Sequence, residues 1–157
     1  MLNIRIKKGF TLIELIIVMA IIAILALIIF VAVDPSRRIH AANNANRASN
    51  VNAILNAYLN YVADNKGTHV TSTTSNVAYM IGQGSTGGTC AATATTLKID
   101  LRSLVDNYIS SIPYDPVTGM STETRYYYIK STNTRVTIGA CDPEAEGTTT
   151  PVIFVQR

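Results

Sequence analysis

The feature that most constrains this chain is an apolar segment from Phe10 to Val33, in which only Thr11 and Glu14 are polar. The segment is long enough to cross a bilayer as a helix. A carboxylate deep in the hydrocarbon of a membrane costs roughly 2.5–3.5 kcal/mol on insertion scales. A segment that served only as an anchor would not be expected to carry Glu14, so the sequence predicts a membrane helix with a second task.

The residues after this segment distinguish it from a cleaved secretory signal. No A-x-A cleavage site closes the run, and Asp34, Pro35 and Ser36 follow it directly. A simple signal anchor is an alternative on hydropathy alone. Because Pro35 disfavours helix at the residue before it and lacks a backbone N–H donor, we expect a kink or a melted turn at 33–36.

The positive charge of the chain is concentrated ahead of the apolar segment. The 157 residues include 13 Lys and Arg against 10 Asp and Glu, which gives a formal net charge of +3. Three of the cations, Arg5, Lys7 and Lys8, precede the segment, where positive charge sets membrane orientation. The rest of the chain is formally neutral and has no basic stripe interleaved with aromatic residues, so we expect no direct nucleic-acid binding.

The stretch KKGFTLIEL (Lys7–Leu15) and the apolar run after it resemble the class III signal of type IV pilins and the related pseudopilins. In that family a short basic leader ends in Gly and is removed by prepilin peptidase. The first mature residue, usually Phe, is N-methylated, and the fifth is Glu. The resemblance implies a leader at 1–9 that is cut after Gly9. It also implies a methylated N-terminus at Phe10 and an assembly role for Glu14 together with Phe10.

The resemblance implies a structural role without catalysis. The chain would be a subunit of a type IV pilus-like filament, a helical homo-oligomer that polymerises through its hydrophobic N-terminal helix. The implied partners are prepilin peptidase, the membrane and the assembly machinery of a pilus or a secretion system. The precursor would be a single-pass protein of the inner (cytoplasmic) membrane, and the filament would lie on the cell surface. A major pseudopilin of a type II secretion system is the alternative, and a membrane-anchored enzyme is a remote one.

After the transmembrane and assembly segment, which we place at 10–33, the sequence predicts that the helix continues. Apolar residues recur every three or four positions from Ile39 to Val62, which favours helix to about Asn65. The helix is expected to end at Lys66-Gly67. Residues 34–157 would therefore hold the second half of a long helix and a globular head.

The head is expected to be a small α+β domain. Residues 68–96 are rich in Thr, Ser and Gly and are interpreted as a connector, while 100–109 is interpreted as a second helix with Asp100 as its N-cap. Three β-branched or aromatic runs predict strands: Arg125–Lys130, Thr134–Ala140 and Val152–Gln156. The short segments between them predict an antiparallel meander packed on the long helix. The resemblance implies the same fold class, α+β with a long N-terminal helix against a small antiparallel sheet.

The remaining chemistry-bearing residues are few. Cys90 and Cys141 lie far apart and are expected to form a disulfide in an exported chain, with two buried free thiols as the alternative. No hydrolase, metalloprotease or nucleotide-binding motif occurs, so no catalytic residue, cofactor or metal site is predicted. Asp115 is interpreted as a turn cap. The acidic stretch at 142–147 could ligate calcium but lacks the EF-hand pattern, and a solvated loop is the favoured interpretation.

The first prediction concerns processing. The motif places the cut between Gly9 and Phe10, where a small, flexible residue suits a peptidase at the membrane surface. The mature chain is therefore expected to begin at N-methylated Phe10, as measured by mass spectrometry of its N-terminal peptide. A mature chain that begins at Met1, or one that is cut after Ala32, would contradict the pilin interpretation.

Overall fold

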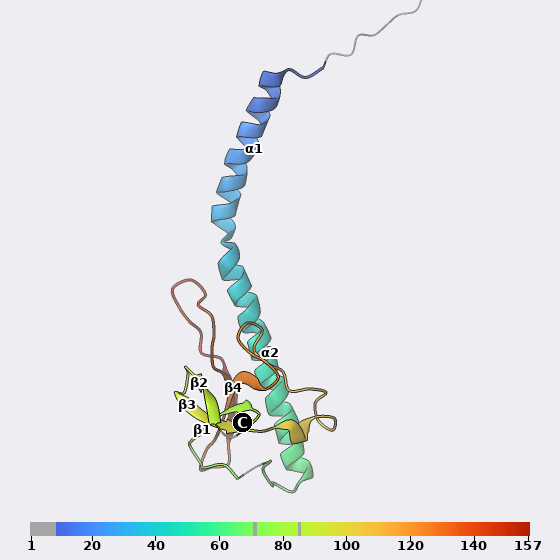
Figure 1. The fold of residues 1–157 in the computed structure, drawn as a ribbon, viewed down its shortest axis with the longest axis vertical. Helices are drawn as coiled ribbons and strands as arrows, with labels where there is room; N and C mark the ends of the chain where they lie inside the picture. Colours follow the sequence, from blue (N-terminus) through green and yellow to red (C-terminus); the bar gives the residue numbers. More distant parts are fainter. Residues whose placement is uncertain (1–8, 71, 85) are drawn as a thin grey trace, which may run out of the picture. The chain divides into compact units, whose positions relative to one another are not determined.

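The computed structural model describes residues 9–157 except residues 71 and 85. The chain divides into two compact units, of which the first ends at Ser36 and the second spans Arg37–Arg157. The first unit contains the apolar helix. The second contains a helix packed against a sheet (Figure 1).

The helical part of the chain is interrupted at Asp34, which confirms the expected break. Helix α1 (Leu12–Val33) ends there, and α2 (Pro35–Asp64) begins at the next residue. Asp34 has a left-handed backbone conformation (φ 42°, ψ 76°), which Asp tolerates better than most residues. Its carboxylate accepts a hydrogen bond from the Ser36 hydroxyl (2.8 Å). Pro35 suits the first position of a helix because no N–H partner is needed there.

Helix α2 ends at Asp64, one residue before the predicted end at Asn65. Lys66 and Gly67 both have positive φ (54° and 86°). The N–H of Gly67 donates to the carbonyl of Val62 (2.8 Å), so a carbonyl of the last turn is satisfied as the chain turns away.

The second unit contains a six-stranded sheet in the order β2-β3-β1-β4-β5-β6. Its strands are β1 (Ala78–Gly82), β2 (Thr86–Cys90), β3 (Thr95–Ile99), β4 (Glu123–Lys130), β5 (Val136–Ala140) and β6 (Phe154–Gln156). Strands β1 and β3 are parallel, and the other neighbouring strands are antiparallel. The three strands expected from the sequence are present as the antiparallel meander β4-β5-β6, and the class is α+β as predicted.

The interpretation of 68–96 as a connector is wrong, because β1, β2 and the start of β3 lie within it. Strand β1 coincides with a short apolar stretch of the sequence, AYMIG. Strands β2 and β3 have the sequences TGGTC and TTLKI, which are too polar to stand out in a hydropathy pattern. Thr nevertheless favours strands because of its branched β-carbon, and strand neighbours supply the remaining stabilisation.

The predicted helix at 100–109 is also wrong. This segment holds only a short 3₁₀ helix, η1 (Arg102–Leu104), followed by turns. The Asp100 carboxylate accepts hydrogen bonds from the backbone N–H and the guanidinium of Arg102, and such local bonds compete with helix formation. Asp106 has a φ of 73°, which excludes helix at that residue.

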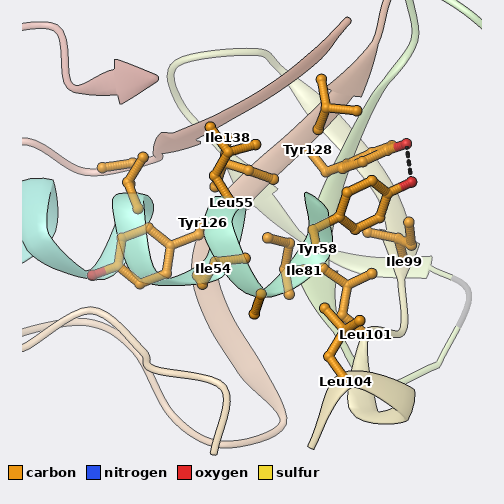
Figure 2. Packing of buried hydrophobic residues seen from close by; sticks show 14 residues of the cluster. Ile54, Leu55, Tyr58, Ile81, Ile99, Leu101, Leu104, Tyr126, Tyr128 and Ile138 are labelled. Carbon is orange, nitrogen blue, oxygen red and sulfur yellow. Dashed lines mark hydrogen bonds between the residues drawn. The ribbon is translucent and has the colours of Figure 1, made fainter. Parts of the chain in front are cut away.

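The core of the second unit lies between α2 and the sheet (Figure 2). Large side chains that are at most 1% exposed fill it: Val51, Ile54, Leu55, Tyr58, Ile81, Leu101, Leu104, Tyr126, Tyr128 and Ile138. The Tyr58 hydroxyl lies 2.9 Å from the Tyr128 hydroxyl and 2.8 Å from Nδ1 of His69. Burial raises the pKa of Tyr58, so its hydroxyl stays neutral. Because the chain has no Trp and three Phe, tyrosines supply the bulky rings, and their hydroxyls require partners.

The predicted disulfide between Cys90 and Cys141 is present. It joins the end of β2 to the residue after β5, with Cα atoms 4.9 Å apart. Met80 and Tyr127 form a small second cluster with it. The Tyr127 ring lies over Gly139, where a β-carbon would clash with the ring. The cross-link therefore ties the edge strand β2 to the end of β5, which is not its neighbour in the sheet.

Removal of the disulfide is expected to lower the free energy of unfolding. The cysteines are separated by 51 residues in the sequence, for which the chain-entropy model gives roughly 4 kcal/mol. Urea unfolding of the oxidised chain in neutral detergent would be compared with the reduced chain and with a Cys90→Ala/Cys141→Ala variant. Alkylation without reductant should modify no thiol, and two alkylated thiols in material from the cell surface would contradict the pairing.

Candidate functional site

The predicted cleavage site lies at the start of the described chain. Gly9 has no heavy atom within 4 Å of the position that a β-carbon would take, and Phe10 is 86% exposed. Within the described part of the chain, the Gly9–Phe10 peptide is therefore open to an enzyme. The rest of the predicted leader, residues 1–8, lies outside the described residues.

Thr11 and Glu14 form a capping box at the start of α1. The Thr11 hydroxyl accepts a hydrogen bond from the Glu14 N–H (3.2 Å), and the Glu14 carboxylate accepts one from the Thr11 N–H (3.4 Å). Two N–H groups that would lack helical partners are satisfied in this way. The carboxylate also lies where the helix dipole favours negative charge. Glu14 is thus held within one turn of Phe10.

Helix α1 buries none of its 22 residues. Apart from Glu14, every residue of this helix is apolar, so no polar face is available to meet water. The described part of the chain contains one helix that is long and apolar enough to cross a membrane. A signal sequence near an N-terminus meets the same two criteria. The exposed surface of α1 requires lipid or another apolar partner.

Residues 4–30 match the family model described as the prokaryotic N-terminal methylation motif. This motif is typical of type IV pilins and pseudopilins. The N-terminal part of the chain is therefore similar to that of type IV pilin-like proteins. The helix-and-sheet fold is pilin-like as well, although the matched motif itself covers only the N-terminal part of the chain. A search of curated proteins and a search of solved structures each found no significant match.

The matched motif indicates how the chain is processed and the general class of its role. It implies processing by prepilin peptidase and a membrane-anchored precursor. Pilin-like proteins are typically structural subunits rather than enzymes. Over the described residues, no group of three or more His, Cys, Asp or Glu is placed to hold a metal ion.

The acidic loop at 142–147 is hydrogen-bonded to other parts of the second unit, which corrects its interpretation as a solvated loop. Both carboxylate oxygens of Asp142 accept hydrogen bonds from the guanidinium of Arg125 (2.6 and 2.8 Å). Glu144 accepts one from Nη1 of Arg47 (2.8 Å). Since cations of the same chain engage these carboxylates, the loop does not offer them to calcium.

Arg47 of α2 joins three parts of the second unit, although it is fully buried. Its Nε and Nη2 donate to the two carboxylate oxygens of Asp115 (2.6 and 3.0 Å). Its Nη1 donates to Glu144 and to the amide oxygen of Asn44 (2.9 Å). Bidentate pairing and four hydrogen bonds offset the cost of burying the charge. Sequence reasoning missed Arg47, because a single Arg on the polar face of a helix is normally exposed.

Asp115 caps a turn, as predicted, and is also the main partner of Arg47. It accepts hydrogen bonds from the N–H groups of Val117 (2.9 Å) and Thr118 (3.0 Å). Burial opposes ionisation of Asp115, but the bonds from Arg47 and from these two N–H groups outweigh it, so the pKa of Asp115 is lowered. Burial likewise opposes ionisation of Glu144, and Arg47 again outweighs it and lowers the pKa.

The Arg47–Asp115 pair is expected to make folding sensitive to acid. A carboxyl with a lowered pKa stabilises the folded state above its ordinary pKa of about 4, and this contribution is lost as the pH falls through the folded-state pKa. Asp115→Asn should lower the free energy of unfolding at neutral pH by about 3 kcal/mol and flatten its decrease below about pH 4. Chemical unfolding at several pH values measures both effects.

Asp100→Asn is the matched control for this prediction. Asp100 also pairs with an arginine (2.6 Å), but the side chain of that Arg102 is 64% exposed. Its loss should cost less than about 1 kcal/mol at neutral pH, because exposed ion pairs contribute little. Equal losses from Asp100→Asn and Asp115→Asn would contradict the role assigned to burial.

Proposed function

We propose that the chain is a structural subunit of a type IV pilus-like filament. Prepilin peptidase cuts after Gly9, Phe10 is N-methylated, and the subunits polymerise through α1. One observation carries the proposal: a 22-residue apolar helix with no buried residue lies largely within the matched N-terminal methylation motif at 4–30. In water such a surface is strongly unfavourable, so α1 passes from lipid into contact with other copies of itself.

Transfer from lipid to a helical bundle gains little from the hydrophobic effect, because lipid tails are as apolar as Leu or Ile. Close packing must therefore contribute to assembly. Ala20, Ala23 and Ala26 recur every three residues in α1 and allow neighbouring backbones to approach closely. Contacts of this kind give adhesion but define axial register only weakly.

The charge of Glu14 supplies the register in this proposal. Among the residues that the structure describes, its carboxylate makes one long contact (3.4 Å), which it accepts from the N–H of Thr11. Cleavage creates a positive amine on Phe10, four residues earlier in the sequence. When the helices bundle, either charge alone costs several kcal/mol to bury. Pairing of Glu14 with the Phe10 amine of a neighbouring subunit offsets that cost only at the correct axial stagger.

A major pseudopilin of a type II secretion system is the alternative, since it would use the same processing and the same helix packing. The two differ in the length and location of the fibre. Electron microscopy of native cell surfaces with an antibody to this chain separates them, because long labelled fibres favour the pilus subunit. Labelling without long fibres favours the pseudopilin. No contact among the described residues favours the membrane-anchored enzyme.

The capping role and the charge role of Glu14 can be separated by substitution. Glu14→Gln can keep the capping box, since Gln serves at this position, but it removes the charge. Glu14→Leu removes both, and Thr11→Ala removes the cap while keeping the charge. We expect both Glu14 variants to be cut normally before Phe10 and to lower filament yield by roughly ten-fold or more, a loss that corresponds to about 1.4 kcal/mol.

Thr11→Ala should still form filaments, because loss of a helix cap costs only about 1 kcal/mol. Filament yield would be measured by shearing and immunoblotting, and the N-terminus of every variant by mass spectrometry. Normal yield from a fully processed Glu14→Gln variant would show that capping suffices and would remove the charge-pairing mechanism. Loss of cleavage in the Glu14 variants would also contradict it.

A further inference from the structure

Strand β6 leaves one edge of the six-stranded sheet open. It is the last strand in the sheet order, and β5 is its neighbour on one side. The carbonyl of Ile153 accepts a hydrogen bond from the N–H of Ala140 (2.9 Å), and Arg157 exchanges two backbone bonds with the first residue of β5 (2.7 and 3.0 Å). Such bonds alternate along an antiparallel strand. The N–H and carbonyl groups of Phe154 and Gln156 therefore point away from β5, toward the open edge.

The side chains of this segment divide between the core and the surface. Ile153 and Val155 pack against the core cluster. Because successive side chains of a strand alternate between faces, Phe154 and Gln156 lie on the opposite face of the sheet. Phe154 is 53% exposed there, and Val152, which precedes it at the same spacing, is 77% exposed. The open edge therefore combines outward-pointing backbone groups with two exposed apolar side chains.

The edge at the other side of the sheet is protected in a way that β6 is not. The register of β2 with β3 is irregular between Thr86 and Cys90, and Gly88 has a positive φ of 68°. Irregularities of this kind, like Lys or Pro on an edge, prevent an edge strand from pairing with another chain. The stretch VIFVQ (Val152–Gln156) contains neither Lys nor Pro, and β6 pairs with β5 in regular register. The β6 edge is thus suited to accept a further strand.

The sequence VIFVQ is complementary to itself when two copies run antiparallel. With Phe154 opposite the same residue of a second copy, Val152 lies opposite Gln156, and the outward N–H and carbonyl groups of all three residues face each other. The two Phe side chains then form a cross-strand aromatic pair, a combination that stabilises sheets. Arg157 lies beyond the paired stretch, so no like charges are opposed. A second copy of this chain is therefore the occupant that the edge fits.

We propose that the open edge of β6 pairs with β6 of a second copy of this chain, antiparallel and centred on Phe154. The pairing joins two six-stranded sheets across a two-fold axis. It goes beyond the proposed filament, because a two-fold contact is isologous, whereas subunits related by a helical operation meet through two different surfaces. The contact therefore joins subunits in the membrane before assembly rather than successive neighbours in one filament.

The pairing is a weak contact for a free protein. A paired stretch of five residues buries less surface than the roughly 1,000 Å² of a stable interface. Two copies that are anchored in one membrane have a much higher effective concentration than two copies in solution. The dimer is consequently expected in membranes and should dissociate on dilution in detergent.

The test is cross-linking of single-cysteine variants of the full chain in membranes of cells that express it. In the proposed register the two Cα atoms at position 154 are about 5.5 Å apart, whereas those at position 156 are about 14–15 Å apart. A short bis-methanethiosulfonate reagent should therefore join Phe154→Cys to itself but not Gln156→Cys to itself. Co-expression of Val152→Cys with Gln156→Cys should restore the dimer. The native cysteines are both in the disulfide.

Two further variants separate pairing from collision and from loss of fold. Val117→Cys, at a residue that is 57% exposed elsewhere in the second unit, should give no dimer above background. Phe154→Lys in the co-expressed Val152→Cys and Gln156→Cys chains opposes two like charges and should lower the dimer yield roughly five-fold. Phe154→Tyr should retain it. The comparison between Phe154→Cys and Gln156→Cys is decisive even if the lysine variant unfolds.

Several outcomes would overturn the proposal. They are the absence of a Phe154→Cys dimer, equal cross-linking of Gln156→Cys or Val117→Cys, and cross-linking of Phe154→Cys to a different protein. Phe154→Cys combined with Glu14→Leu should still form the dimer, because the pairing does not use α1, and its loss would place the contact inside the filament. Filament yield of Glu14→Leu alone tests assembly, so failure of this inference is distinct from failure of the proposed function.

Discussion

An apolar helix that buries none of its own residues must make its apolar contacts outside the chain that carries it, and this constraint governs the rest of the molecule. Over the described part of the chain, none of the 22 residues of helix α1 is buried. The second unit must therefore be stable without help from α1. It achieves this with a core between α2 and a six-stranded sheet, so that the apolar helix is available for lipid or for neighbouring subunits.

Helix α2 holds the head by two contacts of different chemistry. Around Ile54 and Tyr58 it packs apolar and aromatic side chains against the sheet (Figure 2). Nearer its start, Arg47 and Asn44 bind the acidic loop and Asp115 through hydrogen bonds. The apolar contact contributes most of the stabilisation, since it removes large side chains from water. The polar contact fixes the position of the acidic loop and of Asp115 relative to α2, because bidentate hydrogen bonds tolerate little displacement.

The parts of the structure that the sequence predicted are those encoded by neighbouring residues. The processing motif, the helix break at Asp34 and the end of α2 all depend on residues a few positions apart, and the disulfide has only one possible pairing. Strands β2 and β3 were missed because Thr and Gly carry little hydropathy signal. Arg47 and Asp115 were not linked because 68 residues separate them.

The disulfide also determines how the second unit behaves when it is stretched. Strands β3, β4 and β5 all lie between Cys90 and Cys141. A chain segment of 51 residues would extend by roughly 170–180 Å if it were pulled straight. With the cross-link in place, tension passes from Cys90 to Cys141 through the sulfur atoms, and the strands between them bear none of it. Under load the head can lengthen only outside this loop, so β3, β4 and β5 are mechanically shielded, whereas β1, which lies between β3 and β4 in the sheet, is outside the loop.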